Sequence, residues 1–104
     1  MALAPLTDEQ RRAALDKAFA ARQARADVKT DLKSGRLRLG EVLGRAGGDD
    51  ALSKMRVYDL LRSLPGVGDR RALVLMEEVG IAQSRRLRGL GKHQKAALLE
   101  KFGE

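Results

Sequence analysis

Leu64-Pro65-Gly66-Val67-Gly68 is the stretch around which the rest of the sequence is organised. Proline has no backbone N–H and its ring collides with the preceding helical turn, so a helix that approaches Pro65 must end there. Gly66 and Gly68 then allow backbone angles that residues with a Cβ avoid. The stretch therefore predicts a tight turn, or hairpin, between two helices.

An apolar helical period lies on each side of this hairpin. The period before it consists of Val57, Leu60, Leu61 and Leu64. The period after it consists of Ala72, Leu75, Met76 and Val79. Gly80 then ends the second helix, and Ile81 is the apolar residue expected to pack on its last turn. We predict a helix–hairpin–helix unit whose two periods are buried.

The hairpin also predicts a place for an anion. Backbone N–H groups at the start of the second helix lack intrahelical partners, and the helix dipole favours negative charge there. Taken alone, a Pro-Gly-x-Gly tetrapeptide is more often a plain connection between helices. The basic surroundings favour a phosphodiester ligand, and the pattern resembles the helix–hairpin–helix elements that bind DNA without sequence specificity.

The charge of the sequence is high and uneven. The 104 residues carry a net charge of +7 and no cysteine. Residues 1–38 contribute +4, residues 39–81 contribute −1 and residues 82–104 contribute +4. A near-neutral middle between basic ends is typical of a polyanion binder. The chain is long enough for one small domain and offers no disulfide or thiolate chemistry.

Composition also limits the possible cellular location and the possible ligands. No segment is long and apolar enough to span a membrane, and the residues up to Pro5 are too few and uncharged for a signal peptide, so we expect no membrane partner and a cytoplasmic location. The aromatic residues Phe19, Tyr58 and Phe102 fall on apolar periods, where we expect them to be core. Because single-stranded binders need exposed stacking rings, double-stranded DNA is favoured.

A long helix precedes the hairpin unit. Thr7 and Gln10 form a capping box, and Gly35 is a stop signal, so the helix is expected to run to about Lys33. Its apolar residues lie on different sides: Leu15 and Phe19 share one face, and Val28 and Leu32 lie far round the cylinder. We expect the C-terminal half to dock on the domain and the N-terminal half to project or pack elsewhere.

Cations on one side of this helix give a candidate secondary DNA contact, formed by Arg22, Arg25 and Lys29. A solvated charged face explains them equally well. The segment after the helix is expected to hold a short helical piece from Leu39 to Leu43, broken by Gly40 and Gly44. A last helix should run from Lys92 to Phe102. No segment alternates with period two, so no strand is predicted.

These elements define the predicted fold class, which is all-α. We divide the chain into a long basic N-terminal helix, residues 1–36, and a DNA-binding domain, residues 37–104. The strongest functional candidates are Arg85, Arg86 and Arg88, because arginine grips phosphate bidentately and fits a narrow minor groove. Leu87 is expected to be a buried anchor, and Ser84 and Lys92 are further candidates. We expect this arginine segment to lie beside the hairpin, so that both line one wall.

At this point nearly the whole chain resembles the actinobacterial, or mycobacterial-type, integration host factor family. The resemblance is carried by Ser63-Leu64-Pro65-Gly66-Val67-Gly68, by Gly80-Ile81 and by Ser84-Arg85-Arg86-Leu87-Arg88-Gly89-Leu90-Gly91. It implies a long N-terminal helix on a helix–two-turns–helix domain. It also implies a nucleoid-associated protein that binds duplex DNA with little sequence preference, bends it and assists phage integration, with phage integrase complexes as further partners.

The resemblance assigns phosphate contacts to the hairpin residues Pro65, Gly66, Val67 and Gly68, and to Arg85, Arg86 and Arg88. The sequence departs from the family at Asp69, where lysine is common, and at Leu73, a commonly polar position. Asp69 would repel a phosphate, although it could cap the helix. Arg70 and Arg71 are candidates for the missing positive charge. We expect a monomer without a cofactor.

Two other classes of function share the same structural unit. An RNA-binding structural protein is the alternative, because a ribosomal small-subunit protein has the same helix–two-turns–helix unit; it carries a long basic tail, whereas this sequence ends at Glu104. The same unit occurs in glycosylases that use an N-terminal proline, but Pro5 is internal and its nitrogen is an amide. His93 has no partner at metal-ligand or triad spacing. We therefore expect no enzyme and no metal.

Overall fold

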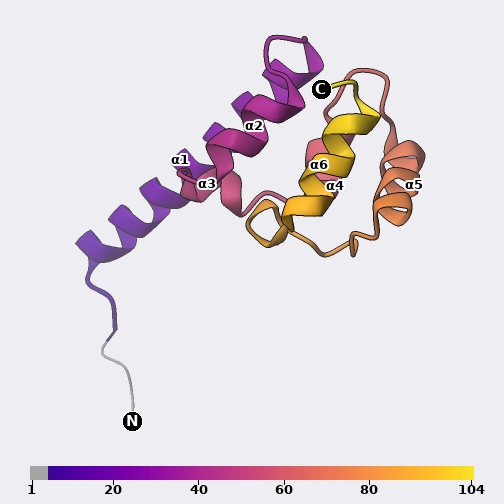
Figure 1. The fold of residues 1–104 in the computed structure, drawn as a ribbon. Coiled ribbons are helices and arrows are strands. Elements are labelled where there is room, and N and C mark those ends of the chain that lie inside the picture. Colours follow the sequence, from indigo (N-terminus) through magenta and orange to yellow (C-terminus); the bar gives the residue numbers. More distant parts are fainter. Residues whose placement is uncertain (1–4) are drawn as a thin grey trace.

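The computed structural model describes residues 5–104, which form six α-helices and one short 3₁₀ turn (Figure 1). In chain order they are α1 (Asp8–Lys33), α2 (Leu39–Ala46), α3 (Asp50–Ser53), α4 (Val57–Arg62), α5 (Asp69–Val79), η1 (Leu87–Gly89) and α6 (Lys92–Lys101). Within this part of the chain, β pairing is limited to an isolated bridge between Arg56 and Arg86. The all-α prediction is confirmed. The expectation about a signal peptide falls on Met1–Ala4, outside the described residues.

Helix α1 begins at the predicted capping box. The Gln10 amide donates to the Thr7 hydroxyl (3.1 Å), and the Thr7 amide donates to the Gln10 side chain (2.9 Å). The last turns of α1 pack on the domain through Val28 and Leu32, both buried. Its first turns project from the domain, which gives the molecule a longest dimension of 49 Å (Figure 1).

The projecting half of α1 corrects one expectation about the core. Leu15 and Phe19 are 67% and 64% exposed, so Phe19 is not a core residue. Its helical spacing fits an apolar face, but among residues 5–104 no other element packs against that face. Tyr58 and Phe102 behave as expected, because both are partly buried against the core.

Helix α2 is longer than expected and contains both Gly40 and Gly44. A helical glycine costs about 1 kcal/mol, whereas burying one large apolar side chain contributes about 1.5–3 kcal/mol. Four buried side chains outweigh the two glycines: Leu39, Val42, Leu43 and Ala46. The start of α2 is held by Glu104, whose carboxylate accepts from the amides of Leu39 (3.1 Å) and Gly40 (2.9 Å).

The predicted hairpin connects α4 and α5. Gly66 adopts a φ of +75°, which an L side chain disfavours, and Val67 is buried beneath the turn. Gly80 ends α5 with a φ of +79°, and the Ile81 amide donates to the carbonyl of Met76 (2.8 Å), as predicted for a Schellman end. Within residues 5–104, no helix has the length and apolar character that crossing a bilayer requires.

Candidate nucleic-acid interface

The first candidate surface is the start of α5 at the hairpin. Gly68 precedes the helix, and no side chain caps it there. The Ala72 amide makes the first intrahelical bond, to the Gly68 carbonyl (3.0 Å), so the preceding amides of the first turn have no helical acceptor. Pro65, Gly66 and Gly68 are exposed, and a Cβ built on Gly68 meets no atom within 4 Å. An anion therefore has open access to these donors.

Asp69 does not cap α5 but forms an ion pair. Its carboxylate lies 3.4 Å from a guanidinium nitrogen of Arg62. Arg62 also lies over the ring of Tyr58, 5.2 Å from its centroid. The hydrogen bond with Tyr58, followed by the charge of Asp69, raises the pKa of Arg62 above its already high value. Arg62 thus offsets the charge that would repel a phosphate here, and Arg70 and Arg71 are exposed on the same turn.

The second candidate surface is the arginine segment, residues 84–88. It is fastened to the start of α4: the Val57 amide donates to the Arg85 carbonyl (3.0 Å), and the Leu87 amide donates to the Met55 carbonyl (2.9 Å). Leu87 is buried, which confirms it as an anchor. The guanidinium of Arg86 donates to the Lys54 carbonyl (2.6 Å), and that of Arg85 to the Gly89 carbonyl (2.9 Å). Each guanidinium has further donors available.

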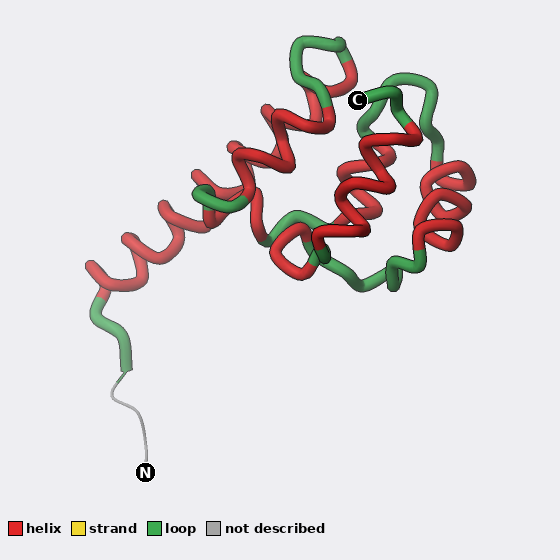
Figure 2. The backbone as a smooth tube through the Cα atoms, in the orientation of Figure 1, coloured by secondary structure: helices red, strands yellow, loops and turns green. Residues whose placement is uncertain are grey.

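The placement of this segment corrects the expectation that it lies beside the hairpin. The arginine segment adjoins Val57 at the beginning of α4, whereas the hairpin follows Arg62 at its end. Helix α5 has 11 residues, which at ~1.5 Å each carry the chain about 16 Å. The two loops consequently sit at opposite ends of α4 and α5 (Figure 2).

The arginine segment instead meets the secondary candidates from α1. A hollow of about 220 Å³ is lined by Arg25, Lys29, Lys54, Met55, Arg56, Asp59 and Arg86. Five of these side chains are cations and one is an anion. The guanidinium of Arg25 donates a hydrogen bond to the Ala51 carbonyl (3.3 Å), which fixes its position in the hollow. Lys54 and Arg56 were missed from the sequence, because single cations between short helices carry no periodic signal.

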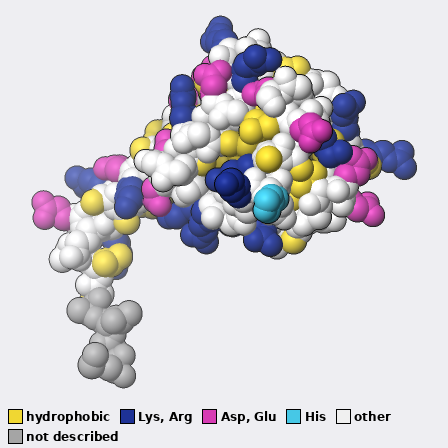
Figure 3. Space-filling model, viewed as in Figure 1, with side chains coloured by type: hydrophobic (Ala, Val, Ile, Leu, Met, Phe, Trp, Pro, Cys, Tyr) yellow, Lys and Arg dark blue, Asp and Glu magenta, His cyan; other side chains and the backbone are white. Residues whose placement is uncertain are grey.

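The other candidates diverge from this hollow. Arg88 lines a separate hollow of about 230 Å³ together with Lys95. Ser84 lies in another hollow, which Tyr58 also lines. Arg22 is exposed on α1, and Lys92 is exposed as the first residue of α6. In the view of Figure 3, Lys and Arg side chains are distributed over both α1 and the domain. Among residues 5–104, no three His, Cys, Asp or Glu side chains form a group that could hold a metal.

Comparisons with known proteins agree with this architecture. Residues 32–102 match the model of the S13-like H2TH (helix–two-turns–helix) domain family. The chain is 57% identical to an integration host factor of Mycobacterium tuberculosis over 99% of its own length and 98% of that protein. The chain belongs to the actinobacterial integration host factor family. This membership confirms the resemblance carried by the sequence motifs and the expectation that the chain is not an enzyme.

Further members of the integration host factor family are equally similar. The factor of Streptomyces coelicolor is 54% identical over 99% of this chain and 96% of its own, and that of Mycolicibacterium smegmatis is 56% identical over 100% and 99%. A solved structure described as sIHF bound to an 8-bp palindromic DNA superimposes with a TM-score of 0.83. It is 50% identical and covers 85% of this chain and 99% of that one.

Proposed function

We propose that this chain binds duplex DNA through its sugar–phosphate backbone with little sequence preference. The observation that carries the proposal is the hollow at the start of α4, where Arg25, Lys29, Lys54, Arg56 and Arg86 face one carboxylate, Asp59. Like charges held around a concave surface focus a positive potential, which attracts a polyanion. The similar solved structure, which holds DNA, supports the same partner.

The proposed contacts occupy both ends of α4. At one end, they are the backbone of Pro65, Gly66, Val67 and Gly68, with Arg70 and Arg71 beside it. At the other end, the contacts are Arg85 and Arg86, with Arg25 and Lys29 on α1. Ser84, Arg88, Lys92 and Arg22 lie outside that hollow and are proposed as additional phosphate contacts. Such groups contact phosphates, which carry no sequence information directly.

Bending of the bound duplex is a further part of this proposal. The phosphate interactions that a bend permits would offset its elastic cost. We propose that the chain acts as a monomer on the nucleoid in the cytoplasm, where it bends and organises chromosomal DNA and assists phage integrase complexes. The two-domain division at residue 36 remains a prediction.

A competition experiment tests the partner. A labelled DNA duplex bound to the protein is challenged with unlabelled duplex or with a ribosomal RNA fragment of equal length, at the same salt concentration. We expect the DNA duplex to compete more strongly. Stronger competition by the RNA would favour the structural RNA-binding function that the S13-like domain also allows.

A further inference from the structure

A groove between α1 and α4 runs from the arginine segment to the hairpin end. Its first part is the 220 Å³ hollow already described. Its second part is a hollow of about 520 Å³ lined by Lys29, Thr30, Lys33, Ser34, Arg62 and Ser63. Lys29 lines both parts, so the two hollows adjoin at this side chain. Ser63 stands two residues before Pro65, so the groove ends at the hairpin.

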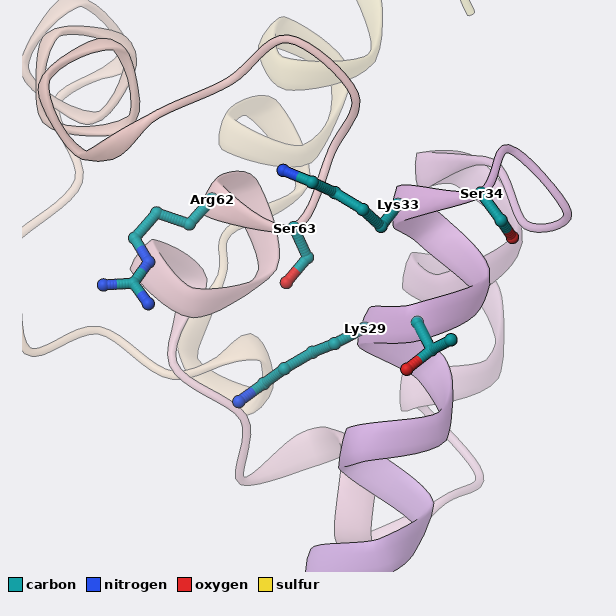
Figure 4. Close-up of a pocket in the computed structure, with 6 residues that line it drawn as sticks. Lys29, Lys33, Ser34, Arg62 and Ser63 are labelled. Carbon is teal, nitrogen blue, oxygen red and sulfur yellow. The ribbon is translucent and has the colours of Figure 1, made fainter.

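The 520 Å³ hollow between α1 and α4, called the second hollow below, has a lining that suits an anion. Figure 4 shows Lys29 and Lys33 extending from α1 towards α4, with the Ser63 side chain between them. Among residues 5–104, neither lysine has a carboxylate within 4.0 Å. Arg62 contributes only its stem, because its guanidinium points away and pairs with Asp69. Two unpaired ammonium groups therefore line this hollow. The hydroxyls of Thr30, Ser34 and Ser63 already donate to backbone carbonyls, so the two lysines are the groups that attract an anion.

We propose that this groove is a phosphate track that carries one DNA strand between the arginine segment and the hairpin. The inference rests on the proposed function and adds Lys33, Lys54 and Arg56 to the contact surface. Helix α4 has six residues and is roughly 9 Å long, over which one strand of a duplex presents about three phosphates. An elongated polyanion fits a groove that is open along its length better than an isolated ion does.

The test removes the two unpaired lysines of the second hollow. The variant Lys29→Gln/Lys33→Gln is compared with Lys17→Gln/Arg45→Gln, which removes the same charge from exposed positions outside the groove. The slope of log binding constant against log salt concentration is measured for each with a DNA duplex. The groove variant should lose about two from the magnitude of this slope, and the control variant less than one.

The outcomes separate the groove from the proposed function. Equal slopes for the two double variants would overturn the phosphate track, because net charge alone would then explain the loss. If Arg86→Ala still weakened binding in that case, DNA binding at the ends of α4 would stand. Inorganic phosphate added at constant ionic strength should not displace the duplex; specific displacement would show that the groove takes a free anion instead of a DNA strand. Thermal melting checks that both double variants are folded.

Discussion

The backbone amide of Val57 donates a hydrogen bond of 3.0 Å to the carbonyl of Arg85. Because Val57 is the first residue of α4, this bond fixes the arginine segment at the start of that helix. The hairpin follows the other end of the same helix. Helix α4 is thus the spacer between the two proposed DNA contacts, and its packing in the core sets the distance between them.

Replacing Arg86 by alanine should weaken binding to all duplexes alike. The side chain lines the basic hollow and uses one donor on the Lys54 carbonyl, so its other donors can reach phosphate. The salt slope should fall by about one, as for the loss of one phosphate contact. Fluorescence anisotropy with two unrelated duplexes measures this, and Arg45→Ala on α2 is the matched control. A loss confined to one duplex would indicate base recognition.

Replacing Gly68 by valine tests the hairpin backbone. Gly68 has a φ of −93°, and its Cβ position is open, so the free protein should keep a native melting curve. The added side chain should nevertheless hold a phosphate away from the amides of the first turn of α5 and reduce affinity for every duplex. Electrophoretic mobility shifts measure the affinity. Unchanged affinity with native melting would show that the hairpin only connects two helices.

Substitutions on the two faces of α1 should differ sharply in their effect on stability. Phe19→Ser changes an exposed side chain and should alter the free energy of unfolding by no more than about 0.5 kcal/mol. Leu32→Ala empties a fully buried position and should cost about 2–5 kcal/mol. Urea denaturation compares them. A large loss with Phe19→Ser would mean that the projecting half of α1 packs against a partner.

Glu104 should contribute to stability through the start of α2. Its carboxylate accepts from the amides of Leu39 and Gly40, so Glu104→Ala leaves two helix N-terminal donors without this acceptor. Loss of such a cap costs about 0.5–2 kcal/mol. Differential scanning calorimetry should show a lower Tm than for Glu100→Ala, an exposed position on α6. Equal Tm values would argue against the cap.

The features that could be predicted from the sequence are those fixed by local chemistry. Helix ends are set by signals within a few residues, and the sequence contains such signals at Thr7, Pro65 and Gly80. The ends of these helices could therefore be predicted. The break expected at Gly40 and Gly44 was wrong because burial of the apolar face of α2 is a tertiary effect. The same limit applies to Phe19, since periodicity does not show whether a partner element exists.

The relative positions of the candidate site residues depend on the lengths of the helices and on how they pack, which the sequence did not show. In the sequence, the hairpin precedes α5 and Arg86 follows it. The length of this helix places the two sites at opposite ends of it. Arg56 and Ser63 share hollows with Lys29 only because α1 and α4, which are distant in the sequence, lie on opposite sides of those hollows. The sequence therefore showed which basic residues are candidates, but it did not show that some of them line one groove.

The central claim, that the protein grips phosphates irrespective of sequence, is tested most directly by measuring duplex affinity against salt concentration for two duplexes of unrelated sequence. Each phosphate neutralised contributes about 0.9 to the slope of log affinity against log salt, through counterion release. We predict steep and equal slopes for both duplexes. A flat response, or slopes and affinities that differ strongly between the two, would contradict the account.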